Sequence, residues 1–252
     1  MEGKSMERRD IQPPQMLIAG SAGAHARVAA IRIVDEIKDA LSEKGYCTLF
    51  LSGGATPRPV YKEMARPQTS KTVDWTKVQF YFVDERCVPP DHPESNYRMA
   101  AEEFLSPIHA AAEQIHRIRG ESSDPESEAT RYAGELPTGD IDIMILGIGA
   151  EGHTASLFPD SKALNEVQRP AAAVIVPASP SRRITITPPV IKRARQRIVL
   201  ASGVSKAGII ARAIRGRYMP NVLPVQFALP GLWILDADAA SELRIETDQE
   251  LL

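Results

Sequence analysis

The sequence predicts an α/β protein with a mostly parallel sheet, and three features of the chain carry that prediction. Short apolar runs such as residues 141–146, interrupted only by Asp142, are typical of strands that helices cover on both faces. These runs alternate with longer segments whose apolar residues recur at helical spacing. Several runs end in glycine-rich or charged turns, and such turns lie at the edge where open α/β sheets bind ligands.

The first half of the chain alternates strands with helices. A short strand over residues 15–19 leads to a long helix that begins at Ser21 and ends at Gly45. The further strands expected here cover residues 47–51, 78–83 and 115–118. Three further helices are expected. One begins at Pro57, one covers residues 96–105, and one lies within residues 121–136.

The second half repeats this alternation. Residues 173–176 and 183–187 are expected to add two strands at the far side of the same sheet, and Pro188 begins a helix. The remaining elements are strands over residues 197–201 and 233–236, a helix whose first turn contains Lys206, and a last helix over residues 237–243. No linker or repeat interrupts the succession. We therefore expect residues 1–14 to form a flexible arm and residues 15–252 a single domain.

The composition excludes several classes of partner. The 30 Lys and Arg nearly cancel the 32 Asp and Glu, so we expect no general affinity for nucleic acid or an anionic membrane. No apolar run approaches the ~20 residues that span a bilayer, and the polar N-terminus lacks the apolar centre of a signal peptide, which predicts a cytoplasmic protein. Cys47 and Cys87 are expected to be buried thiols. Four histidines share no metal-ligand spacing with each other or with His153: His25, His92, His109 and His116.

A histidine that follows three glycines is the strongest candidate for catalysis. The central apolar run ends at Gly147, Gly149 and Gly152, and His153 follows immediately. Glycine lets the backbone adopt conformations closed to other residues and approach a ligand closely. A histidine with its usual pKa of ~6.5 exchanges protons at neutral pH. A capping or core histidine is the alternative, but the adjacent glycines favour a functional one.

The same glycines also satisfy the dinucleotide-binding pattern Gly-x-Gly-x-x-Gly. That pattern belongs to a first strand-helix-strand unit, with a long helix after the third glycine and an acidic residue ~20 positions on. Here it lies past the middle of the chain, Pro159 ends any helix almost at once, and no acidic residue closes the next strand. We therefore expect neither a nicotinamide nor a flavin cofactor.

A second glycine-rich turn, Ser52-Gly-Gly-Ala-Thr-Pro57, joins a strand to a helix. In such a turn unpaired backbone N–H groups and the helix dipole face an anion, so the segment predicts a phosphate site. A tight turn in which Thr56 is the helix cap is the alternative. Two glycines and two hydroxyls exceed what a cap needs, which favours phosphate binding.

Charged side chains stand at strand ends, where they are expected to face the cleft. Arg86 would bind a phosphate or carboxylate, Asp84 would orient a hydroxyl or a catalytic group, and Glu85 is expected to face solvent. Of Arg182 and Arg183, one is expected to reach the cleft. In the first turn of a helix, the charge of Lys206 opposes the helix dipole, which predicts an anion nearby.

Four segments, in this order, resemble the 6-phosphogluconolactonase family, within the group that includes glucosamine-6-phosphate deaminase. They are Ser52-Gly-Gly-Ala-Thr-Pro57, Phe82-Val-Asp-Glu-Arg86 with Glu94-Ser-Asn-Tyr97, Gly147-Ile-Gly-Ala-Glu-Gly-His-Thr-Ala-Ser-Leu-Phe-Pro159, and Gly203-Val-Ser-Lys206. The resemblance spans residues 15–243. It implies a Rossmann-like α/β/α sandwich that binds a small phosphorylated sugar lactone. The sequence does not give the oligomeric state, and we expect a monomer or a small homo-oligomer. The implied reaction is hydrolysis of the δ-lactone of 6-phosphogluconate in the oxidative pentose phosphate pathway, without a metal.

By this resemblance the catalytic histidine corresponds to His153, and the acidic residue shared with the deaminases to Asp84. The residues that correspond to phosphate and substrate contacts are Ser52, Gly53, Gly54, Thr56, Arg86, Gly152, Arg183 and Lys206. At the position before Gly152 the family usually has aspartate. This chain has Glu151 there, and the glutamate carboxylate reaches one methylene further. We expect Glu151 to orient His153 or to hold a hydroxyl, and His153 to act as general base on water.

Two other functions compete with lactone hydrolysis. A glucosamine-6-phosphate deaminase would find a base in Asp84, but the segment after His153 lacks the glutamate of the deaminases' Asn-Glu-Pro, and Arg86 replaces their tyrosine. A sugar-phosphate-sensing domain of a transcription regulator would carry a basic helix-turn-helix, for which the N-terminal arm is too short. Ser156 lacks the flanking glycines and oriented partner of a nucleophilic serine.

Overall fold

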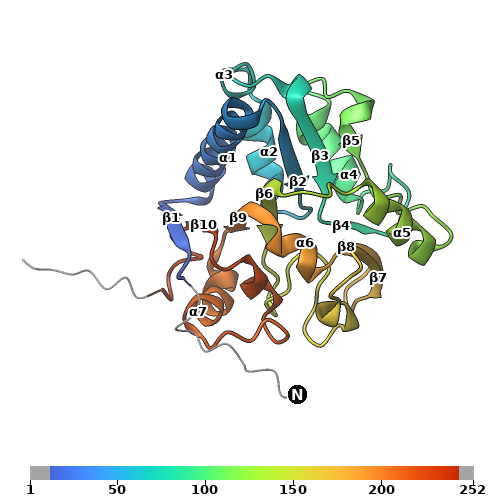
Figure 1. Cartoon of the computed structure of the whole chain (residues 1–252). Coiled ribbons are helices and arrows are strands. Elements are labelled where there is room, and N and C mark those ends of the chain that lie inside the picture. The colour runs from blue at the N-terminus through green and yellow to red at the C-terminus, as the bar shows by residue number, and fades with distance from the viewer. Residues whose placement is uncertain (1–11, 244–252) are drawn as a thin grey trace, which may run out of the picture.

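The structure, a computed structural model, describes residues 12–243 of the chain. Its main sheet has seven parallel strands in the spatial order β1-β10-β9-β6-β2-β3-β5 (Figure 1). They are β1 (Gln15–Ala19), β2 (Cys47–Leu51), β3 (Val78–Phe82), β5 (Ile115–His116), β6 (Ile141–Gly147), β9 (Ala194–Ala201) and β10 (Leu232–Asp236). The predicted α/β class with a parallel sheet is confirmed. Most of the arm predicted for residues 1–14 lies outside the described residues.

Helices cover both faces of this sheet, with α1 and α2 on one face and α6 and α7 on the other (Figure 1). The α-helices are α1 (Ala22–Lys44), α2 (Pro57–Ala65), α3 (Pro67–Ser70), α4 (Asn96–Ala100), α5 (Pro125–Glu135), α6 (Pro188–Lys192) and α7 (Ala207–Arg215). The bounds of α1 follow the sequence prediction. The Ser21 side chain accepts a hydrogen bond from the N–H of Ala24, and Gly45 ends the helix in the left-handed conformation, with φ of 79°.

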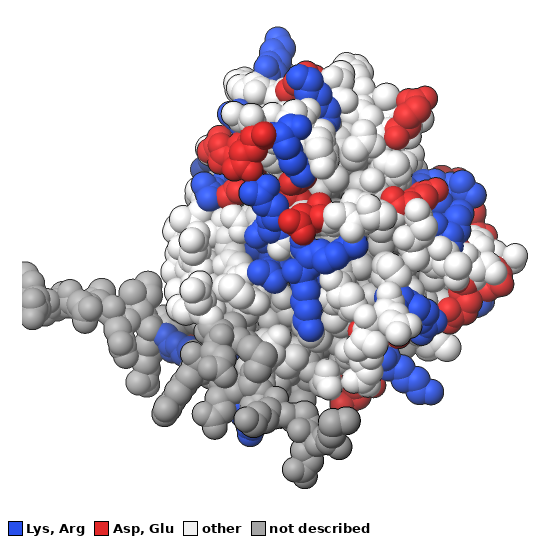
Figure 2. All heavy atoms as spheres, in the orientation of Figure 1, with Lys and Arg blue, Asp and Glu red and all other residues white. Residues whose placement is uncertain are grey.

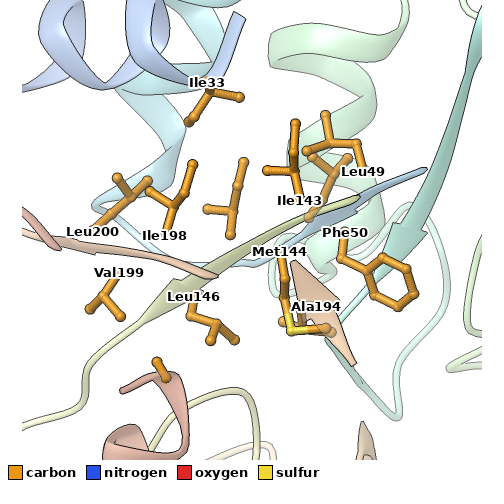
Figure 3. Close-up of a cluster of buried hydrophobic side chains, with 14 of the residues drawn as sticks. Ile33, Leu49, Phe50, Ile143, Met144, Leu146, Ala194, Ile198, Val199 and Leu200 are labelled. Atoms are coloured by element: carbon orange, nitrogen blue, oxygen red, sulfur yellow. The ribbon is translucent and has the colours of Figure 1, made fainter. Parts of the chain in front are cut away.

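The central strands are apolar on both faces because both faces are buried. Alternate side chains point in opposite directions, as Figure 3 shows: Leu49, Ile143 and Ile198 toward Ile33 of α1, and Phe50, Met144 and Val199 away from it. Burial of each such large apolar side chain stabilises the fold by about 1.5–3 kcal/mol relative to exposure. This packing keeps the strand ends, and the loops that they carry, in place.

The strand order reverses between β2 and β6, which are neighbours in the sheet. From β2 the chain continues to β3 and β5 on one side, and from β6 it continues to β9 and β10 on the other. The connections that leave the carboxyl ends of β2 and β6 therefore diverge and leave a crevice between them. Open α/β sheets bind their ligands at such a reversal.

Two of the predicted strands lie elsewhere than expected. β7 (Ala171–Ile175) and β8 (Arg182–Ile186) form an antiparallel hairpin that pairs with β4 (Asp84–Arg86) in a separate sheet of three strands. The prediction that they extend the main sheet is wrong. A short connection of residues 176–181 joins them, and antiparallel pairing needs only such a turn, whereas a parallel pair requires a long crossover.

The C-terminal helix predicted over residues 237–243 is also absent, and consecutive turns replace it. The carboxylate of Asp236 accepts a hydrogen bond from the N–H of Ala239, and the last backbone bond of the segment, from Leu243 N–H to Ala240 carbonyl, spans only three residues. A side chain that binds nearby backbone N–H groups competes with helix formation. Cys47 is buried as expected, but Cys87 is only partly buried.

The molecular surface matches the near-neutral composition. On the face that Figure 2 shows, basic and acidic side chains are interspersed in small groups. Among residues 12–243, no helix combines the length and the apolar character that crossing a membrane requires.

Asp142, the polar exception in the central strand, is buried and links β6 to β2. One carboxylate oxygen accepts hydrogen bonds from the N–H and the hydroxyl of Thr48, at 2.8 and 2.9 Å. The other lies 2.6 Å from the ammonium of Lys44 at the end of α1. The Lys44 pairing satisfies a carboxylate that would otherwise be costly to bury.

We predict that Asp142→Ala lowers the free energy of unfolding by about 3 kcal/mol, because it leaves a cation and two buried donors without their acceptor. Urea denaturation measures the change. Asp140→Ala is the matched control, since Asp140 is exposed two positions away, and it should change stability by less than about 0.5 kcal/mol. Equal stability of the two variants would contradict a structural role for Asp142.

Candidate active site

A cavity of about 420 Å³ lies at the strand-order reversal. Its wall includes the turn after β2, residues of β4, the loop after β6 and Lys206. The volume falls in the range of small-molecule sites. Two segments that are far apart in the sequence, residues 52–56 and 147–153, thus contribute to one cavity, as the topology requires.

The turn of residues 52–56, hereafter the 52–56 turn, is anchored from beneath by Tyr61 of α2. The Tyr61 hydroxyl accepts a hydrogen bond from the N–H of Ser52 at 3.0 Å and donates one to the Ser52 carbonyl at 2.8 Å. Gly54 has a φ of 103°, a conformation that favours glycine. Thr56 occupies the N-cap position of α2, as the alternative interpretation predicted, but its side chain makes no capping hydrogen bond. All five residues of the turn line the cavity.

The loop after β6 carries His153 into the cavity. Its imidazole stacks on the ring of Phe158, with centroids 4.0 Å apart, and packs closely on the backbone of Gly149. A Cβ atom at position 149 would lie 2.0 Å from Nδ1 of His153, so only glycine leaves room for the ring. The loop is closed by a hydrogen bond from the N–H of Gly149 to the carbonyl of His153.

Burial lowers the pKa of His153, and the negative charge of Glu151 opposes that shift without reversing it. His153 Nδ1 lies 3.1 Å from Oε2 of Glu151, although the ring N–H does not point directly at the oxygen. The positive charge of Lys206 also lowers the pKa of His153, as a smaller contribution. The imidazole is therefore neutral at pH 7, which is the form that accepts a proton.

Asp84 lies in the same cavity, and two neighbours hold its carboxylate. Oδ2 accepts a hydrogen bond of 2.6 Å from the hydroxyl of Ser156, and Oδ1 accepts one of 3.2 Å from the side-chain amide of Asn96. Neither partner is predicted from the sequence. Ser156 is considered there only as a nucleophile, and Asn96 is assigned no role of its own. The Glu94-Ser-Asn-Tyr97 segment of the family motif is the one signal that points to Asn96.

Glu85, predicted to face solvent, is buried instead. Its carboxylate accepts hydrogen bonds from the backbone N–H groups of Arg86, Asn96 and Tyr97 and from the hydroxyl of Ser95. Burial raises the pKa of Glu85, and these backbone hydrogen bonds oppose the rise. The reason for the error is the second sheet, since β4 pairs with β8 and both Asp84 and Glu85 are buried there, whereas a loop would leave Glu85 exposed.

Two guanidinium groups meet at the cavity wall. Burial, and then the charge of Arg86, lower the pKa of Arg183, whose Nε donates a hydrogen bond to the carbonyl of Pro180. Arg86 donates to the carbonyl of Glu94 at 2.5 Å. Arg183 is therefore the arginine of its pair that reaches the cavity, whereas Arg182 is exposed and is not part of the cavity wall.

Lys206 precedes α7 and lines the cavity. The turn before it is held by Asp236, whose carboxylate accepts hydrogen bonds from the Ser202 hydroxyl at 2.5 Å and from the N–H of Gly203 at 3.0 Å. These bonds help to lower the pKa of Asp236 below its ordinary value against the effect of burial. The expected position of Lys206 in the first helical turn is shifted by one residue, since α7 begins at Ala207.

Two expected site residues do not line the cavity. Glu151 contacts His153 rather than the cavity space, which fits the expectation that it orients the imidazole. Gly152 has a φ of 90°, and a Cβ atom there would lie 2.7 Å from a methyl group of Leu223. The φ angle and the close packing both explain why residue 152 is glycine, and neither supports direct substrate contact.

Comparisons with known proteins identify the family of the chain. The family model described as glucosamine-6-phosphate isomerases/6-phosphogluconolactonase matches residues 20–233. A 6-phosphogluconolactonase of Synechocystis sp. is 35% identical over 228 residues, which cover 86% of this chain and 92% of the relative.

Solved structures give the same result. A 6-phosphogluconolactonase from Trypanosoma cruzi superposes with a TM-score of 0.80 at 29% identity, covering 92% of this chain and 97% of its own. A monomeric glucosamine-6-phosphate deaminase, 22% identical with a TM-score of 0.79, shares the fold over 90% of this chain and 99% of its own. Among the described residues, no group of three His, Cys, Asp or Glu side chains is placed to hold a metal ion. The chain belongs to the glucosamine-6-phosphate isomerase/6-phosphogluconolactonase family.

Proposed function

We propose that the protein is a 6-phosphogluconolactonase, which hydrolyses 6-phospho-D-glucono-1,5-lactone to 6-phosphogluconate. The observation that carries this proposal is a neutral, partly buried imidazole that shares one cavity with three cationic side chains and a glycine-rich turn. The cations suit the phosphate, and the imidazole suits an ester bond at the other end of the same small molecule. The relatives named above support the same reaction.

The phosphate is bound by the 52–56 turn together with Arg86, Arg183 and Lys206. Burial and the positive charge of Arg86 lower the pKa of Arg183, and an anion bound between the two guanidinium groups relieves their repulsion. Because the phosphate is remote from the reacting bond, its binding energy serves to place the lactone carbonyl beside His153.

His153 acts as the general base. If Nδ1 carries the proton toward Glu151, Nε2 is free to accept a proton from water while the water oxygen attacks the lactone carbonyl carbon. When the tetrahedral intermediate collapses, the bond from carbon to ring oxygen breaks, and the imidazolium returns the proton to that oxygen. The products are the carboxylic acid and a free hydroxyl, without a covalent enzyme intermediate.

The developing negative charge on the carbonyl oxygen needs a donor from the loop after β6. The N–H groups of Gly149 and Gly152 already donate to the carbonyls of His153 and Gly149. We therefore propose the N–H of Ala150, whose residue lines the cavity, as a stabilising donor. The carboxylate of Asp84 would accept a hydrogen bond from a sugar hydroxyl.

Deamination of glucosamine 6-phosphate is less well supported. The segment after His153 supplies Thr154 and Ser156 rather than the acid that ring opening needs. The deaminase named above shares the fold, and its identity to this chain is too low to argue for its reaction.

Direct assays test the proposed function. The purified protein should accelerate formation of 6-phosphogluconate from freshly generated lactone, followed by coupling to a dehydrogenase and corrected for spontaneous ring opening. It should release no ammonia from glucosamine 6-phosphate. Ammonia release without lactone hydrolysis would reverse the assignment.

We predict that His153→Ala lowers kcat for the lactone by ~10²–10⁴, the contribution of a positioned general base. Binding of 6-phosphogluconate, measured by titration calorimetry, should change little because the phosphate contacts remain. His109→Asn is the control, since His109 is exposed and is not part of the cavity wall. Unchanged turnover in His153→Ala would exclude it as the base.

We predict that Glu151→Gln moves the acidic limb of the kcat/KM profile to lower pH. Activity requires neutral His153, so kcat/KM falls as the pH drops through the pKa of that residue. The charge of Glu151 raises this pKa, and its removal lets burial lower the pKa further. Glu121→Gln, which alters a glutamate paired with Arg117, should leave the profile unchanged. A limb that moves to higher pH would contradict the proposed contact.

A further inference from the structure

We propose that Asn96 is a positioning residue, which holds the carboxylate of Asp84 at a set distance from the 52–56 turn. This inference deepens the proposed function and rests on it. The separation between the Asp84 carboxylate and the 52–56 turn would then match the separation between the lactone ring and the phosphate of the substrate. Three contacts of its side chain and backbone carry the argument, and Asn96 itself is 3% exposed.

The side-chain amide of Asn96 has one possible orientation. Its Nδ2 donates hydrogen bonds to the backbone carbonyl of Asp84 at 2.9 Å and to Oδ1 of the same residue at 3.2 Å. Both partners are acceptors, so the NH₂ group must face Asp84 and the amide oxygen must face the other way. The hold on Asp84 is therefore directional.

The amide oxygen of Asn96 faces the 52–56 turn at Gly53. A Cβ atom at position 53 would lie 1.7 Å from this oxygen and 2.2 Å from the amide carbon. The backbone of Gly53 is outside the left-handed region, so no conformational demand requires glycine there. Glycine at this position is explained by the close approach of Asn96 alone.

The main chain at Asn96 is held in place as well. Its backbone N–H donates a hydrogen bond of 2.8 Å to Oε1 of buried Glu85, and α4 starts at Asn96. The side chain is therefore fixed between the end of β4 and the turn after β2. Through Asn96, a displacement of the turn becomes a displacement of the Asp84 carboxylate.

A double-mutant cycle tests this coupling. Gly53→Ala should lower kcat/KM for the lactone by ~10²-fold, because the new methyl group displaces Asn96 or the turn. Asn96→Ala should lower it roughly 10-fold, the effect of losing a hydrogen bond to a charged group. The double variant should be no worse than Asn96→Ala, since the methyl group added at position 53 then has room. A loss in the double variant equal to the product of both single losses would overturn the proposal.

Gly54→Ala is the matched control. Gly54 has a φ of 103° and open space where a Cβ atom would lie, so alanine there strains the backbone without touching Asn96. Asn96→Ala should not rescue it, and the two losses should multiply. Rescue of Gly54→Ala to the same extent as Gly53→Ala would contradict a specific contact.

Thermal unfolding and wild-type activity separate the remaining outcomes. If Asn96 has only a structural role, Asn96→Ala will have a lower melting temperature but an unchanged kcat/KM when assayed well below that temperature. That result would overturn the positioning role. Absence of lactone turnover in the wild-type protein would instead refute the proposed function. The Gly53 contact would then be tested by the same cycle in melting temperatures.

Discussion

The site depends on one topological feature, the reversal of strand order between β2 and β6. Parallel strands end at the same edge of a sheet, and neighbouring strands whose connections diverge leave an open space there. The 52–56 turn and the loop that carries His153 leave these two strands. The 52–56 turn, which binds the anion, and His153, which accepts the proton, thus face one cavity although about a hundred residues separate them in the chain.

Close backbone contacts then set the fine geometry. The imidazole of His153 packs against Gly149, and the amide of Asn96 packs against Gly53. In each pair a functional side chain lies where a Cβ atom would otherwise be. These glycines act by absence of volume, which differs from Gly54, where the φ angle is the reason for glycine. The distinction matters because a volume constraint is relieved by changing the neighbour, and a conformational constraint is not.

Buried carboxylates hold the elements that carry the cavity. Asp142 joins β6 to β2 through Thr48, Glu85 gathers the backbone N–H groups at the start of α4, and Asp236 holds the turn before Lys206. Each accepts at least one hydrogen bond from a backbone N–H group. None of these three acids lines the cavity, whereas Asp84 does.

Local sequence patterns were sufficient to predict the parallel α/β class, the extent of α1, the family and the two glycine-rich segments, because periodicity, caps and short motifs involve neighbouring residues. Long-range packing was needed to establish that β7 and β8 form a second sheet with β4, that Glu85 is buried, and that Arg183 rather than Arg182 reaches the cavity. It also revealed Asn96 and Ser156 as partners of Asp84. Those outcomes depend on pairing between distant strands, which fixes the face each side chain takes, and no local pattern encodes that choice.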